Sequence, residues 1–137
     1  MDDTEDFDFS QVKVLCIDDS KINVTIMASL LQSAGMSVEV AFNAKEGLEK
    51  ADADSFNLIL LDHMMPEMDG IEAFKLLRAQ SKKNANTPTI ILTGNADESY
   101  TELYEDVGFD GYLIKPVLKD RLLRTIISVV DKKNTLI

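Results

Sequence analysis

The sequence predicts a doubly wound α/β domain in which five parallel strands alternate with five helices. Short apolar runs suited to buried strands recur along the chain, and between them lie segments whose apolar residues repeat every three or four positions. Such alternation places helices on both faces of a parallel sheet, joined by right-handed crossovers. The chain has 137 residues, 45% of them hydrophobic, which suits one domain with a substantial core.

The first strand and helix follow from their end signals. Residues 12–17 form an apolar run that predicts the first strand. Ser20 is suited to cap the next helix and Gly35 to stop it, so we place that helix at 21–34. Its predicted apolar face consists of Ile22, Ile26, Met27, Leu30, Leu31 and Ala34.

The later elements are bounded in the same way by capping and turn residues. They begin with a second strand at 37–41, a helix at 44–53 capped by Asn43, a third strand at 58–61 and a helix at 70–81 capped by Asp69. They continue with a fourth strand at 89–92 behind Pro88, a helix at 97–107 closed by Gly108, a fifth strand at 110–114 and a last helix at 118–132. The helix at 97–107 has its predicted apolar stripe at Tyr100, Leu103, Tyr104 and Val107.

Composition limits the partners and the setting. The net charge is −10, from 14 basic and 24 acidic residues, which argues against nucleic acid or an anionic membrane as the direct partner. The sequence holds one cysteine, Cys16, within an apolar run, so we expect a buried thiol and no disulfide. With no apolar span of 18 residues and no leader, we expect a cytoplasmic protein. The expected division is an acidic disordered tail at 1–10, a domain at 11–132 and a short tail at 133–137.

Four of the five predicted strands end in a polar or charged side chain. Asp62 follows the buried run at 58–61 and precedes a turn-rich loop, so it lies at the sheet edge where open α/β folds bind ligands. The second strand supplies no such group, which fits the edge position it takes in the flavodoxin-like strand order 2-1-3-4-5. The other strand ends supply Asp18, Asp19, Thr93 and Lys115.

These side chains together describe a site for a phosphoryl group. Three carboxylates in one crevice repel each other unless a cation compensates, and Mg²⁺ suits a site with few carboxylates and retained waters. Lys115 adds a mobile positive charge suited to phosphate, Thr93 adds a hydroxyl donor, and Gly94 leaves room for close backbone approach. Asp62 is the central acid and therefore the expected nucleophile, which would form an aspartyl phosphate.

The same residues, with MPEMDG following the central acid, resemble the receiver domain of two-component response regulators over residues 12–131. The resemblance implies that Asp62 accepts a phosphoryl group from the phosphohistidine of a histidine kinase or a histidine phosphotransfer domain. It also implies Mg²⁺ as the cofactor. The implied ligands are Asp19, Asp62 and the backbone carbonyl of Met64, with Asp18 holding metal-bound water.

Further roles are implied by the resemblance alone. Thr93 and Lys115 are expected to contact the phosphoryl oxygens, and Lys115–Pro116 is expected to be a cis peptide. Tyr112 matches the aromatic residue that family members swing inward on phosphorylation, so Thr93 and Tyr112 are the expected switch. The variable positions expected to tune dephosphorylation are Met64 and Asn95.

The expected output is a change on one face of the domain. Residues 18–23 and 92–96 resemble receivers attached to hybrid histidine kinases, in which alanine usually occupies the position of Gly94. We expect phosphorylation to switch the face formed by the helix at 97–107, the fifth strand and the last helix, for a partner or output domain. The last helix has more apolar residues than one sheet contact needs, so the surplus is either core or a partner or homodimer face.

Two other functions are less favoured. A Mg²⁺-dependent phosphohydrolase with an aspartyl nucleophile would place a second aspartate two residues after Asp62, where this chain has Met64. A pseudo-receiver that acts by binding alone would lose an acid or the lysine, and both are present. The expected protein is therefore a signalling module that catalyses its own phosphorylation and dephosphorylation. His63 is interpreted as a loop histidine without a chemical role, because successive strand positions point in opposite directions.

Overall fold

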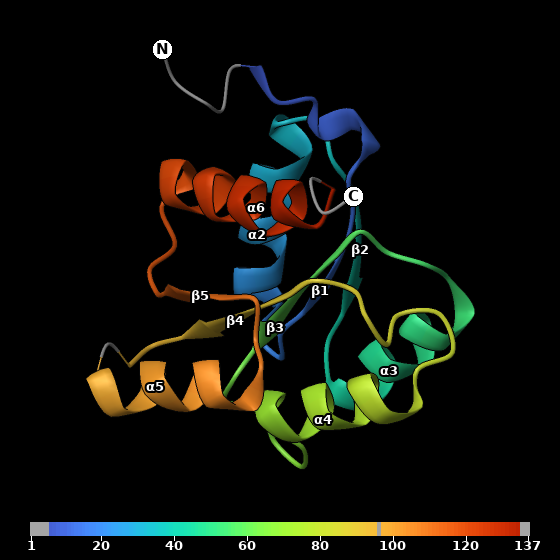
Figure 1. Cartoon of the computed structure of the whole chain (residues 1–137), viewed down its shortest axis with the longest axis vertical. Coiled ribbons are helices and arrows are strands. Elements are labelled where there is room, and N and C mark those ends of the chain that lie inside the picture. The colour runs from blue at the N-terminus through green and yellow to red at the C-terminus, as the bar shows by residue number, and fades with distance from the viewer. Residues whose placement is uncertain (1–5, 96, 135–137) are drawn as a thin grey trace.

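The structure is a computed structural model that describes residues 6–95 and 97–134, and it has a central sheet between two layers of helices (Figure 1). Five parallel strands lie in the order β2-β1-β3-β4-β5, which confirms the predicted topology. The strands are β1 (Lys13–Ile17), β2 (Ser37–Ala41), β3 (Leu58–Asp62), β4 (Thr89–Thr93) and β5 (Gly111–Ile114). The helices are the short 3-10 helix η1 (Phe9–Gln11), α2 (Lys21–Ser33), α3 (Ala44–Ala53), α4 (Gly70–Gln80), α5 (Glu98–Val107) and α6 (Lys119–Asn134).

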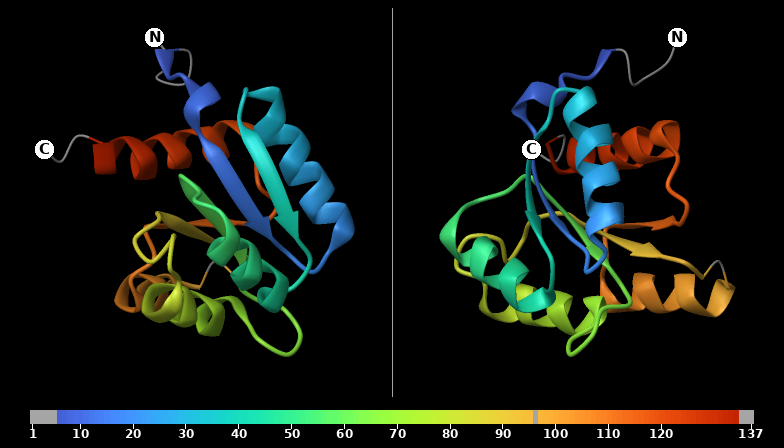
Figure 2. Two further views of the ribbon diagram at one scale, coloured as in Figure 1. Left: turned by 90° about the vertical axis from the view of Figure 1, so that its right-hand side faces the viewer. Right: turned by 180° about the vertical axis from the view of Figure 1, so that it is seen from behind.

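Two apolar cores lie on the two faces of the sheet. Helices α2 and α6 cover one face, and α3, α4 and α5 cover the other, as the views in Figure 2 also show. Because side chains alternate along a strand, Leu58 and Leu60 of β3 contribute to the first core, whereas Ile59 and Leu61 contribute to the second. All four are almost completely buried, so β3 is the central strand that the sequence predicts.

The predicted capping residues begin their helices. Ser20 accepts a hydrogen bond from the amide of Asn23 at the start of α2, and Asn43 does the same for α3. Asp69 and Glu72 form a reciprocal capping box at the start of α4. These local bonds set the helix starts within one residue of their predicted positions.

The predicted apolar face of α2 is partly wrong. The buried side chains are Val24, Met27 and Leu31, whereas Ile22 and Ile26 are 73% and 56% exposed. A helix packs one stripe against a sheet, and the stripe used here leaves the two isoleucines on the solvent side. Helix α5 shows the same effect, since Tyr104 is buried and Leu103 is exposed.

Described residues near both ends of the chain pack against the first core. Phe9, which the sequence assigns to the acidic tail, is buried in the first core, and Asp8 caps η1 by accepting a bond from the Ser10 amide. Most of the surplus apolar side chains of the last helix are core, but Leu118, just before α6, is 66% exposed. The buried α6 side chains are Leu122, Leu123, Ile126, Val129 and Val130.

Within the described residues, no helix is long and apolar enough to span a membrane.

Candidate phosphoryl and metal site

The side chains predicted from the strand ends converge at the carboxyl edge of the sheet. Asp18 follows β1, Asp62 ends β3, and one carboxylate oxygen from each of Asp18, Asp19 and Asp62 lies within 4.8 Å of the others. Asp18 and Asp62 are buried, whereas Asp19 is exposed. Close carboxylate oxygens that are partly open to solvent are the donors that a hard divalent cation prefers. The acidic cluster is therefore compatible with a metal ion.

Lys115 provides the positive charge of the site. Its Nζ donates a hydrogen bond of 2.6 Å to Oδ1 of Asp62 and lies 3.8 Å from Oδ2 of Asp18. The backbone amide of Lys115 donates to the carbonyl of Thr93 at 2.8 Å, which fixes the end of β5 against β4. The peptide bond between Lys115 and Pro116 is cis, as predicted.

The loop after Asp62 folds back on the strand through Gly70. The amide of Gly70 donates to the carbonyl of His63 at 2.8 Å, and an added Cβ would lie only 2.3 Å from the carbonyl oxygen of Asp62. No side chain fits in that space, so glycine is required where α4 begins. The side chain of Met64 in this loop is 74% exposed and leaves the central acid unobstructed.

Burial and repulsion change the acidity of the site. Burial raises the pKa of Asp62 to about 6, Asp18 and Asp19 add to the rise, and the hydrogen bond from Lys115 opposes it. Burial also raises the pKa of Asp18. Burial lowers the pKa of Lys115, but the hydrogen bond and charge of Asp62 outweigh it, so that pKa is raised overall. The site thus contains a protonated lysine and carboxylates that a second cation would stabilise.

The two predicted switch residues, Thr93 and Tyr112, differ in burial. Thr93 is buried at the end of β4, where its hydroxyl oxygen accepts a bond of 3.1 Å from the amide of Asn95. The Asn95 side chain is exposed and accepts a bond from the amide of Asp97. Tyr112 is 38% exposed, and its ring centroid lies 6.3 Å from that of Tyr104.

His63 is more closely integrated than a loop histidine. It lies in the loop, as predicted, but it is buried, and its Nδ1 shares a hydrogen bond of 2.8 Å with the Tyr104 hydroxyl. The pairing of His63 with Tyr104 could not be read from the sequence, because the two residues are 41 positions apart. The alternating directions of strand residues did indicate that His63 and Asp62 would diverge.

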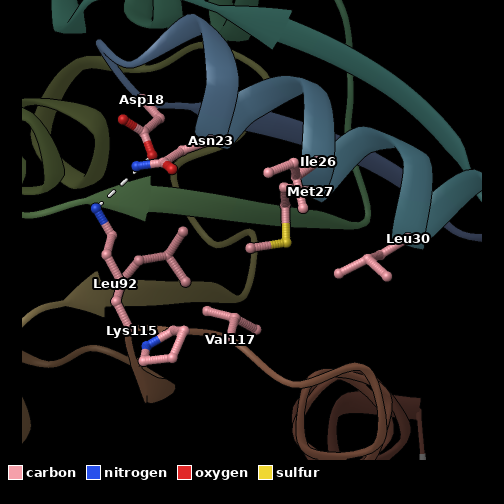
Figure 3. Close-up of a pocket in the computed structure, with 9 residues that line it drawn as sticks. Asp18, Asn23, Ile26, Met27, Leu30, Leu92, Lys115 and Val117 are labelled. Atoms are coloured by element: carbon pink, nitrogen blue, oxygen red, sulfur yellow. Dashed lines mark ion pairs between the residues drawn. The ribbon is translucent and has the colours of Figure 1, made fainter.

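A groove that the sequence did not indicate begins at the site and runs along α2. Figure 3 shows Asp18 and Lys115 at one end of it, and Ile26, Met27 and Leu30 of α2 along one side. Val117, in the segment after β5, lies on the opposite side. The misassigned apolar face of α2 thus contributes Ile26 to the wall of a groove beside the acids.

Comparison with known families identifies the domain. Residues 14–127 match the response regulator receiver domain family. Hybrid signal transduction histidine kinase G of Dictyostelium discoideum is 34% identical over 121 residues, which cover 86% of this chain and 4% of that protein. The transcriptional regulatory protein CpxR of Escherichia coli K12 is 34% identical over 122 residues, which cover 89% of this chain and 50% of that protein. The chain thus spans half or less of these relatives.

Solved structures agree with this match. Chemotaxis protein CheY4 of Vibrio cholerae has a TM-score of 0.80 and 36% identity, with 86% of this chain and 98% of that chain covered. The receiver domain of a sensor histidine kinase from Pseudomonas aeruginosa PAO1, solved with a magnesium ion coordinated in its active-site cleft, has a TM-score of 0.79 and 28% identity. That likeness covers 88% of this chain and 98% of the other. The acid cluster at the carboxyl edge, the sheet order and these matches establish that the chain belongs to the response regulator receiver domain family.

Proposed function

We propose that this receiver domain accepts a phosphoryl group on Asp62 from a phosphohistidine of a histidine kinase or a histidine phosphotransfer domain. The observation that carries the proposal is the 2.6 Å contact between Lys115 and Asp62 within a cluster of three carboxylates. A lone acid at a strand end has many explanations. An acid paired with a lysine and adjacent to a cation site provides a nucleophile together with charges that neutralise a phosphoryl group.

In the proposed transfer, Asp62 is the nucleophile, and Lys115 and Thr93 contact the phosphoryl oxygens. A carboxylate oxygen of Asp62 attacks phosphorus as the phosphorus–nitrogen bond breaks, and the bonding electron pair returns to the donor imidazole. Lys115, which already contacts this carboxylate, turns its ammonium to the phosphoryl oxygens. The Thr93 hydroxyl provides a further donor to one of these oxygens. Transfer therefore depends chiefly on position and charge.

The proposed cofactor is Mg²⁺. Three carboxylates and one ammonium have a net charge of about −2 when the acids are ionised, which a divalent cation balances. The proposed ligands are Asp19, Asp62 and the backbone carbonyl of Met64, with Asp18 acting through water. The ion would neutralise charge on the phosphoryl group and the acids. The related sensor kinase receiver that binds magnesium in its cleft supports this choice of metal.

The proposed donor surface is the groove along α2. Ile22 and Ile26 on α2 and Leu118 before α6 are large, exposed apolar side chains. The groove is continuous with the site, because Asp18 and Lys115 line one end of it. A donor helix that covers these apolar side chains would bring its phosphohistidine to the rim beside Asp62. The face of α5, β5 and α6, which includes exposed Tyr112, remains the proposed surface for an output domain or a second copy.

Binding of beryllofluoride, which mimics an acyl phosphate, tests the proposal. The wild-type domain should bind it only in the presence of Mg²⁺, and Asp62→Asn should abolish binding. The matched control is Asp106→Asn, which removes an exposed carboxylate on α5 and should bind like the wild type. Equal binding by Asp62→Asn, or binding by the wild type without Mg²⁺, would contradict the mechanism. Incubation with phosphoramidate should add one phosphoryl mass to the wild type and to Asp106→Asn but not to Asp62→Asn.

A further inference from the structure

A second groove lies between α3 and the loop that follows β3. Its volume is about 360 Å³, and it shares no lining residue with the groove along α2. Residues of α3 and its cap form one wall, and residues 66–68 form the other. Because α2 and α3 cover opposite faces of the sheet, the two grooves belong to different sides of the domain (Figure 2). The proposed transfer leaves this second groove without a role.

The floor of the second groove is apolar. Ala44, Leu48, Pro66 and Met68 line it, and Leu48 and Met68 are only partly buried where they pack against the second core. A methionine side chain is unbranched and adapts to differently shaped neighbours. Concave apolar surface of this kind fits apolar side chains of a partner.

The rim of the second groove is acidic. Its charged side chains are Lys45, Glu49, Asp52 and Glu67, all of them exposed. Glu49 and Asp52 are three residues apart on α3, so their like charges lie close together and repel. Among the residues that the structure describes, none forms an ion pair with Glu49 or Glu67. Basic side chains of a partner would therefore complement this rim.

The backbone at Glu67 provides an independent indication of function. Glu67 has a φ of 71°, in the left-handed region, and the Met68 amide donates to the Pro66 carbonyl at 2.8 Å across it. A residue with a side chain is strained in this conformation, whereas glycine is not. Such strain is concentrated at ligand-binding and functional sites. The glutamate in this strained turn lies at the rim of the groove, which favours a role for its carboxylate.

We propose that the second groove binds an amphipathic, basic helix of a partner protein. Apolar side chains of that helix would cover Leu48 and Met68, and its lysine or arginine side chains would pair with Glu49 and Glu67. A helix is the fitting occupant because the groove is formed by a helix and a turn and offers no sheet edge to an extended peptide. This interaction goes beyond the proposed function, in which the phosphohistidine donor has its own groove along α2.

The probe for this surface is a dye-labelled model peptide of about 14 leucine and lysine residues, with all leucines on one helix face. Its binding to the full chain is followed by fluorescence anisotropy at physiological ionic strength. The wild type should bind it, and the double variant Glu49→Gln and Glu67→Gln should bind about two- to thirtyfold more weakly, the range for two surface ion pairs. The matched control is Glu102→Gln with Glu105→Gln, which removes the same charge from exposed positions on α5 and should stay within about twofold of the wild type.

Two further measurements separate groove binding from attraction to net charge. A peptide of the same composition without an apolar face should bind at least about tenfold more weakly, because it cannot cover the apolar floor. Glu67→Gly should lower affinity for the amphipathic peptide while leaving the melting temperature unchanged or raising it, because glycine relieves the strain. That combination excludes misfolding as the cause of weaker binding.

Several outcomes would overturn the inference. They are no binding by the wild type, equal binding of the two peptides, and an equal loss in the groove pair and the α5 pair. Loss of binding in Ile26→Ser with none in the groove pair would place the peptide on α2 and would overturn it as well. Neither Mg²⁺ nor a phosphoryl analogue is needed, so failure here leaves the proposed function intact, and failure of beryllofluoride binding leaves this surface intact.

Discussion

The Mg²⁺ affinity of this domain should fall as the pH drops through about 6. Burial raises the pKa of Asp62 to about 6, so this ligand becomes protonated well above the pH at which an ordinary aspartate does. A carboxylate must lose its proton to bind the metal, and the apparent dissociation constant rises with the protonated fraction. Relative to pH 8, it should rise about twofold at pH 6 and about elevenfold at pH 5. An unshifted pKa near 3.8 would give a rise of only about 1.1-fold at pH 5.

The measurement is calorimetric titration with Mg²⁺ between pH 5 and 8 at constant ionic strength. Calorimetry is chosen because the sequence has no tryptophan whose fluorescence could report binding. Lys115→Met provides an internal check, because the hydrogen bond from Lys115 lowers the pKa of Asp62 and its loss should move the midpoint above that of the wild type. An affinity that stays constant down to pH 5, or a midpoint near 4, would refute the reasoning.

In the absence of metal, protonation of Asp62 at low pH should stabilise the fold, although the same protonation weakens Mg²⁺ binding. The folded-state pKa of Asp62 lies above its unfolded value, so the fold favours the protonated carboxyl. The contribution of Asp62 is fully present below about pH 4 and is lost as the pH rises through about 6. The shift corresponds to at most about 3 kcal/mol. Chemical denaturation in EDTA should therefore show this group favouring the fold at pH 5 over pH 8, and Asp62→Asn should weaken that trend.

Four other substitutions, one of them a control, test packing and charge crowding in the domain, each followed by thermal denaturation. Gly70→Ala should lower the free energy of unfolding by about 1–3 kcal/mol and weaken Mg²⁺ binding, because its Cβ would meet the Asp62 carbonyl. The control is Gly94→Ala, whose added carbon has no atom within 4 Å and whose stability should stay within about 0.5 kcal/mol of the wild type. Asn84→Ala should cost about 2–4 kcal/mol, because this buried amide bonds the backbone groups of three residues, Ala51, Asp54 and Phe56; loss of less than about 1 kcal/mol would contradict it. In EDTA, Asp19→Asn should be as stable as the wild type or more stable, because it removes one of three crowded carboxylates, and a clearly lower melting temperature would count against that crowding.

Long-range polar contacts were not predictable from the sequence. Asn84 lies in a polar stretch that is typical of an ordinary loop, yet it is completely buried and bonds the backbone of one segment about 30 residues away. The pairing of His63 with Tyr104 is of the same kind. Local sequence carries no record of which distant group will satisfy a polar side chain.

The sequence by itself determined the order of strands and helices, the capping residues and the set of chemical groups at the strand ends. Those features depend on apolar periodicity and on bonds between residues a few positions apart, such as the cap formed by Asp69. Only the tertiary structure decided which stripe of α2 is buried, so that Ile22 and Ile26 are left on the surface. It also decided that Tyr104 contacts His63. A helix can meet a sheet through any of several apolar stripes, and the choice depends on how the whole core fills its volume.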